Sequence, residues 1–109
     1  KEEEEALRLK EDAILLNDIG CFSMVFEKIP AHLAGEVTAS VDCPTIGIGA
    51  GADCDGQVLV LHDMLGITQE FSPRFLRRYS DIGDQMLGAI QQYVRDVRAV
   101  DFPNESEQY

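Results

Sequence analysis

Residues 44–51, Pro-Thr-Ile-Gly-Ile-Gly-Ala-Gly, lead closely into residues 55–63, Asp-Gly-Gln-Val-Leu-Val-Leu-His-Asp. Each stretch contains an apolar run; the first opens into alternating glycines, and the second ends on His62 and Asp63. Strands of parallel sheets are buried on both faces and have continuous apolar runs. The two runs therefore favour a parallel sheet. Parallel α/β folds place their ligands just beyond the carboxyl ends of the strands. We therefore predict that these residues form one edge of an active site.

The segments before this stretch alternate between helix and strand. Their apolar residues recur at helical spacing or in short continuous runs, with Gly20 as a helix stop and Pro30 at a helix start. The predicted elements are a helix over residues 3–19, a strand over residues 21–26 that closes on Glu27, a helix over residues 30–40 and a strand over residues 44–49. This order is typical of a parallel α/β architecture.

Residues 57–62 admit two interpretations. A parallel return usually needs a crossover of about a dozen or more residues, and residues 50–56 offer fewer. The segment is either a strand reached by an abbreviated crossover without a proper helix, or a helix capped by Asp55 and stopped by Gly66. The uninterrupted Val-Leu-Val-Leu favours a strand over residues 57–62, which is our prediction.

The last predicted element is a long helix, with Ser72 as its N-cap and Pro73 at its first position. Its apolar stripe consists of Phe75, Tyr79, Ile82, Met86, Ile90, Tyr93 and Val97. Gly83 and Gly88 weaken a helix, so we expect a kink or a close contact there. From about residue 101 the tail is acidic, and we expect it to wrap another surface or fray.

The charge balance excludes several classes of partner. A net charge of −11 argues against nucleic acid and anionic membranes, because both need basic patches. The chain has no apolar run of the length that spans a bilayer, and its acidic start differs from a signal peptide, so we expect a cytoplasmic protein. Cys21, Cys43 and Cys54 lack the spacing of a zinc site and are expected to be reduced thiols.

Residues 45–51 and 55–63, preceded by Val-Phe-Glu-Lys-Ile-Pro at residues 25–30, resemble the carboxyl-terminal part of the ketopantoate hydroxymethyltransferase family. The resemblance continues through residues 71–75 to residues 102–103 and covers nearly the whole chain. It implies an eight-stranded (β/α) barrel, with this chain as the last three β/α units of a single barrel domain. Three parallel strands alone would leave exposed edges, which proteins normally cover. We therefore expect a piece of a longer protein or the ordered part of one, in preference to half of a barrel assembled from separate chains.

The resemblance also implies an activity. The family transfers a one-carbon unit from 5,10-methylenetetrahydrofolate to 3-methyl-2-oxobutanoate, with an enolate stabilised by magnesium, and makes ketopantoate for pantothenate and coenzyme A synthesis. The expected partners are a 2-oxo acid, a folate and further copies of the protein in a homo-oligomer. The alternatives are a pyruvate-type barrel lyase that acts on a 2-oxo acid, and a non-catalytic α/β interaction module.

Glu27 is the candidate catalytic residue. It ends an apolar strand, so its carboxylate is expected to project from the carboxyl-terminal mouth of the barrel. By the resemblance, Glu27 matches the carboxylate that removes a proton from the carbon next to the ketone. The competing interpretation is a structural glutamate that pairs with Lys28 or caps the helix beginning at Pro30.

The other candidates have weaker signals. Because they lack a Cβ, Gly49 and Gly51 allow the backbone either to approach a ligand or to pack tightly against its neighbours. Both interpretations of these glycines stay open. His62 is a candidate substrate-binding residue at the rim of the site. We predict no metal site within this chain, because the resemblance places the magnesium ligands on earlier strands. Arg74, Arg77 and Arg78 could bind an anion, but salt bridges are the preferred interpretation.

Overall fold

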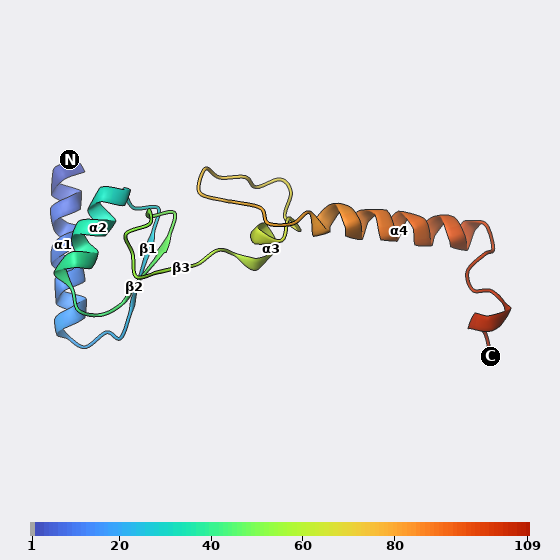
Figure 1. Ribbon diagram of the computed structural model, residues 1–109, viewed down its shortest axis with the longest axis horizontal. Helices are drawn as coiled ribbons and strands as arrows, with labels where there is room; N and C mark the ends of the chain where they lie inside the picture. Colours follow the sequence, from blue (N-terminus) through green and yellow to red (C-terminus); the bar gives the residue numbers. More distant parts are fainter. Residues whose placement is uncertain (1) are drawn as a thin grey trace. The chain divides into compact units, whose positions relative to one another are not determined.

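The computed structural model describes residues 2–109, which form two compact units (Figure 1). The first unit ends at Leu59 and the second begins at Val60. None of the helices within residues 2–109 is long and apolar enough to cross a membrane. The cysteines at positions 21, 43 and 54 are free thiols.

The first unit is a small parallel sheet covered by two helices (Figure 1). Its elements are α1 (Glu2–Asp18), β1 (Met24–Glu27), α2 (Ala31–Ser40), β2 (Thr45–Ile48) and β3 (Gly56–Gln57). The strands lie in the order β1-β2-β3, and both pairs are parallel. The predicted α/β class and parallel sheet are therefore confirmed, as is the short crossover between β2 and β3, which contains no helix.

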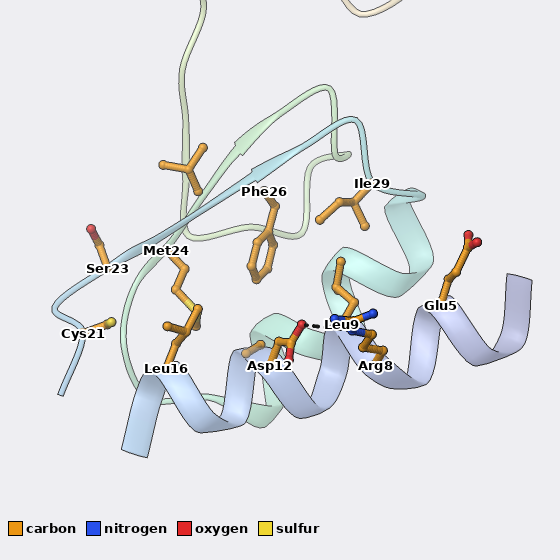
Figure 2. Close-up of a pocket in the computed structure, with 12 residues that line it drawn as sticks. Glu5, Arg8, Leu9, Asp12, Leu16, Cys21, Ser23, Met24, Phe26 and Ile29 are labelled. Carbon is orange, nitrogen blue, oxygen red and sulfur yellow. Dashed lines mark ion pairs between the residues drawn. The ribbon is translucent and has the colours of Figure 1, made fainter. Parts of the chain in front are cut away.

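Side chains alternate between the two faces of β1. Met24 and Phe26 are buried and point toward α1 (Figure 2), where they join the core formed with Ala34 and Val37 of α2. Val25 on the opposite face is 63% exposed. The sheet thus has one face covered by helices and one apolar face without cover in this unit.

Polar contacts join the two helices and the loops that follow them. The Asn17 side-chain oxygen accepts hydrogen bonds from the backbone N–H groups of Asp42 and Cys43, at 3.1 and 3.0 Å. This ties the end of α1 to the loop before β2. Gly20 ends the predicted first helix as expected, with a φ of 94° that favours glycine.

The second unit corrects two predictions. It contains α3 (Leu61–Met64), α4 (Ile82–Arg98) and a short 3-10 helix η1 (Glu105–Glu107). The strand predicted over residues 57–62 is wrong in extent, because β3 covers only Gly56–Gln57 and the apolar run continues into α3. Val60, with an extended ψ of 127°, is the N-cap of α3.

The predicted helix start at Ser72 and Pro73 is also wrong, since α4 begins at Ile82. The backbone N–H groups of Tyr79 and Ile82 bond instead to the carbonyls of Met64 and Leu65, at 2.8 and 3.0 Å. One nitrogen of Arg78 donates to the carbonyl oxygens of three loop residues, Thr68, Gln69 and Phe71. These contacts hold residues 65–81 as a loop and give Arg78 a structural role.

The expected close contact at a helix glycine is present at Gly83. A Cβ there would lie 2.6 Å from the carbonyl oxygen of Gly66. Gly88 has open space around it. In the tail, the Phe102 ring packs edge-on against Tyr93 of α4, with 5.6 Å between ring centroids, and Asn104 caps η1. The tail therefore folds back on α4 near its start.

An exposed ion pair between Lys10 of α1 and Glu36 of α2 gives a testable dependence on pH. A hydrogen bond and the charge of Lys10 hold the pKa of the Glu36 carboxyl below its ordinary value. Because the folded pKa lies below the unfolded one, the pair stabilises the fold above about pH 4.3 and less as pH falls through the folded pKa. We expect Lys10→Met to lower the thermal midpoint of the full-length protein slightly at neutral pH and low salt.

The same comparison at acidic pH and at high salt is the control. The difference between Lys10→Met and wild type should shrink under both conditions, because protonation and screening each remove the attraction. A destabilisation of equal size at every pH would show that Lys10 acts through its aliphatic stem instead.

Candidate functional site

Glu27 lies at the carboxyl end of β1, opposite Ile48 in the parallel register. It is exposed and occupies the same uncovered face of the sheet as Val25. Gly49 directly follows β2, so Glu27 and the glycine loop leave the sheet at the same edge. The prediction that these two sites share one end of a parallel sheet is confirmed.

The turn after Glu27 has a constrained backbone. Lys28 adopts a left-handed conformation with φ of 52°, which is unfavourable for a residue with a Cβ. Its backbone N–H donates to the carbonyl oxygen of Ile48 at 3.0 Å, which extends the ladder by one bond. The chain then enters α2, whose N-cap is Pro30. Such conformations persist where surrounding contacts enforce them, and they are frequent at functional sites.

The structure provides neither of the contacts that a purely structural Glu27 would make. The ion pairs within residues 2–109 are Arg8–Asp12 and Lys10–Glu36. The start of α2 has no side-chain cap. The Glu27 carboxylate thus projects from the sheet edge without pairing to Lys28 or capping the helix that follows.

Each glycine of the 47–51 loop has its own structural reason. A Cβ at Gly47 would lie 3.0 Å from the Cys54 sulfur and 3.2 Å from both amide atoms of Gln57. Gly49 has a φ of 66°. Gly51 combines a φ of 83° with contact to Ala31, where a Cβ would lie 2.5 Å from the Ala31 Cβ. Tight packing therefore accounts for Gly47 and Gly51.

A partly buried polar cluster holds the opposite, amino-terminal end of β2. Thr45 is fully buried, and its backbone N–H donates to the Asp55 carboxylate at 2.8 Å. Its hydroxyl donates to the same oxygen at 3.3 Å and accepts from the Asp55 backbone N–H at 3.2 Å. The Thr38 hydroxyl of α2 lies 2.8 Å from the Thr45 hydroxyl. Because the Thr45 hydroxyl donates to Asp55, the Thr38 hydroxyl is the donor of this bond. The helix capped by Asp55, which was the alternative for residues 57–62, does not form, and Asp55 instead bonds to the start of β2. The sequence analysis did not single out Thr45.

His62 and Asp63 lie in α3 of the second unit. The prediction that they end a strand is therefore wrong: His62 is exposed, and Asp63 is buried at 9% exposure. The His62 carbonyl accepts hydrogen bonds from the backbone N–H groups of Ile67 and Thr68. No group of three or more His, Cys, Asp or Glu side chains within residues 2–109 is arranged to hold a metal ion.

A groove of about 490 Å³ runs between α1 and β1 (Figure 2). Its walls are mainly apolar and include Leu9 and Leu16 of α1 with Met24 and Phe26 of β1. The Arg8–Asp12 ion pair lies on its α1 side. Val25 also lines the groove, which therefore follows the free edge of β1 with side chains from both faces, and Glu27 is not among its lining residues.

Known proteins resemble this chain along its whole length. The family model described as ketopantoate hydroxymethyltransferase matches residues 1–105. The 3-methyl-2-oxobutanoate hydroxymethyltransferases of Parabacteroides distasonis and Phocaeicola vulgatus are 61% and 62% identical over all 109 residues. That of Flavobacterium johnsoniae is 61% identical. The chain spans 40% of the length of each of these relatives. The chain belongs to the ketopantoate hydroxymethyltransferase family.

Proposed function

We propose that the full-length protein transfers a one-carbon unit from 5,10-methylenetetrahydrofolate to 3-methyl-2-oxobutanoate and so makes ketopantoate. The observation that carries this proposal is the family match over residues 1–105, which includes Glu27 at the carboxyl end of a parallel strand. Active sites of (β/α) barrels lie at this end of the strands. The match favours the transferase over a lyase of the pyruvate type and over a non-catalytic module.

The three strands are proposed to be the last three of the barrel, and residues 1–109 part of a single barrel domain. The open face of the sheet supports a place in a barrel. The face that carries Val25 and Glu27 has no helix over it in the first unit, as expected of a barrel interior. The apolar groove beside β1 is then the place for the preceding strand.

In the proposed reaction, Glu27 is the general base. Its carboxylate accepts the proton from C3 of the keto acid, and the electron pair of the broken C–H bond forms the new carbon–carbon bond to the one-carbon unit. The two bonds from that carbon to the folate nitrogens are replaced by this bond and by a bond to the oxygen of a water molecule. Tetrahydrofolate leaves, and its two nitrogens take up the proton from C3 and one from water. An exposed carboxylate without an ion pair at the strand end is free to meet a substrate there. The magnesium ion of the family is proposed to have its ligands outside residues 2–109.

The other candidate residues are also proposed to contact substrate. Gly49 and Gly51 leave the sheet at the same edge as Glu27, and their backbone is proposed to border the substrate. His62, which is exposed, stays a proposed substrate-binding residue. The cytoplasmic location stays a prediction.

Replacing Glu27 tests the proposed base. Glu27→Gln in the full-length protein keeps the size of the side chain but cannot accept the substrate proton. We expect the exchange of the C3 proton of 3-methyl-2-oxobutanoate with solvent deuterium to slow by about 10²–10⁴-fold. Nuclear magnetic resonance follows this exchange without any folate, and the KM for the keto acid should change little.

The matched control is Glu11→Gln, which alters an exposed glutamate on α1. Its exchange rate should equal that of wild type. If Glu27→Gln exchanged the proton as fast as wild type, the base would have to lie elsewhere in the protein.

The apolar stripe of α4 supports the proposed homo-oligomer. The side chains of α4 are all at least partly exposed. The stripe consists of Met86, Leu87, Ile90, Tyr93, Val94 and Val97, which are 38% to 58% exposed. Phe75 and Tyr79, which the sequence analysis assigned to this stripe, precede the helix. An apolar helix face of this extent is typical of a surface that packs against more protein.

A charge in the centre of the stripe tests this assignment. Ile90→Glu in the full-length protein should shift its sedimentation coefficient toward smaller species, because burial of an unpaired carboxylate is costly. Gln92→Glu places the same charge on the opposite face of α4 and should leave the assembly intact. An unchanged sedimentation coefficient for Ile90→Glu would contradict packing of the stripe between copies and leave the rest of the barrel as its cover.

A further inference from the structure

Gln57, the last residue of β3, closes the loop that follows β2. Its side-chain nitrogen donates to the carbonyl oxygen of Gly51 at 2.8 Å. The bond spans residues 51–57, a loop without helix. Gln57 thereby fixes the position of Gly51 relative to the strand ladder, since the Gln57 backbone itself pairs with Gly47.

Gly47 makes the route of this side chain possible. A Cβ at position 47 would lie 3.2 Å from both the nitrogen and the oxygen of the Gln57 amide, closer than most Cβ contacts. The Gln57 amide therefore lies directly over the bare backbone of β2. A Cβ at position 47 would require the amide and the Cys54 sulfur to shift by a few tenths of an ångström.

Gly51 in turn packs against the start of α2. A Cβ on Gly51 would lie 2.5 Å from the Ala31 Cβ and 3.0 Å from its Cα, so the two backbones are in close contact. Ala31 is the first residue of α2 and follows Glu27 by only four positions. The same turn is bonded to β2 through the Lys28 N–H and the Ile48 carbonyl.

We propose that Gln57 is a positioning residue for Glu27. It acts through Gly51 and Ala31, without touching substrate, and holds the turn that presents the Glu27 carboxylate. The inference rests on the proposed function of Glu27 as base. The Glu27 side chain has no ion pair within residues 2–109, so its direction depends on the backbone that carries it. A misplacement of about 1 Å can lower a rate by about 10²-fold.

The test is Gln57→Met in the full-length protein, a change that keeps the length of the side chain and removes its donor. Deuterium exchange at C3 of 3-methyl-2-oxobutanoate should show kcat lowered by about 10-fold to 10²-fold, with KM for the keto acid little changed. Gln57→Lys keeps an N–H donor of similar reach and should recover part of kcat. Gln92→Met, the same substitution on α4, is the matched control and should behave as wild type.

A second measurement does not depend on activity. Amide hydrogen exchange read by mass spectrometry should be faster in Gln57→Met for the peptide that covers residues 28–31, while peptides from α1 keep their wild-type rates. If Gln57→Met does not fold, Gln57→Asn, whose amide is one methylene short of Gly51, is measured in the same two ways.

The outcomes separate the two claims. A wild-type protein that exchanges the C3 proton, together with Gln57 variants that match it in kcat and in amide exchange at residues 28–31, would overturn the role of Gln57 alone. A wild-type protein that fails to exchange the C3 proton in the presence of magnesium would overturn the proposed function and this inference with it. Lowered kcat with partial recovery in Gln57→Lys supports the inference.

Discussion

The parallel ladder between β1 and β2 is the constraint on which the first unit depends. The Met24 N–H bonds to the Pro44 carbonyl before the ladder, and the Lys28 N–H bonds to the Ile48 carbonyl after it. Because side chains alternate along a strand, a slip of one residue would turn Glu27 toward the helices. Burial of Phe26 and its neighbours against α1 and α2 therefore selects the one register that leaves Glu27 on the open face.

Side-chain hydrogen bonds also hold β3 in the sheet, because this strand is only two residues long. Asp55 joins the start of β2 through Thr45, and Gln57 joins the loop beyond β2 through Gly51. The two bonds bracket β3 on both sides. Charge-assisted bonds such as the one from Thr45 to the Asp55 carboxylate are stronger than neutral ones. They hold a strand that backbone pairing alone would hold weakly.

Hydrophobic periodicity was sufficient to predict the first two helices, the first two strands and the parallel sheet. It failed where one apolar run crosses two elements: Val58 donates its N–H to Gly47 beside the sheet, whereas Leu61 begins a helix. It failed again at Ser72, a good N-cap in isolation, because Arg78 and the backbone of Tyr79 bond to distant carbonyls. Such bonds depend on the tertiary structure and leave no local signal.

The sequence likewise predicted some residues of the candidate site and missed others. Glu27 could be found because a polar residue at the end of an apolar run is visible in sequence, and the family resemblance gave it a role. Gly47 and Gly51 were visible as a pattern, but their neighbours Gln57 and Ala31 were not, because those contacts connect segments that are separate in the sequence. His62 was assigned to a strand end by the same apolar run that misplaced β3.

The exposed stripe of α4 has a consequence for how the protein acquires its stability. A helix with none of its side chains buried gains little from its own unit, and most helical stability in proteins comes from packing of an apolar face. We expect its apolar contacts to be completed by surfaces outside this unit, in the rest of the protein or in another copy. When those surfaces belong to another copy, the melting temperature rises with protein concentration. In that case dilution would destabilise this part of the chain, and newly made copies would have to meet their partners before the stripe aggregates.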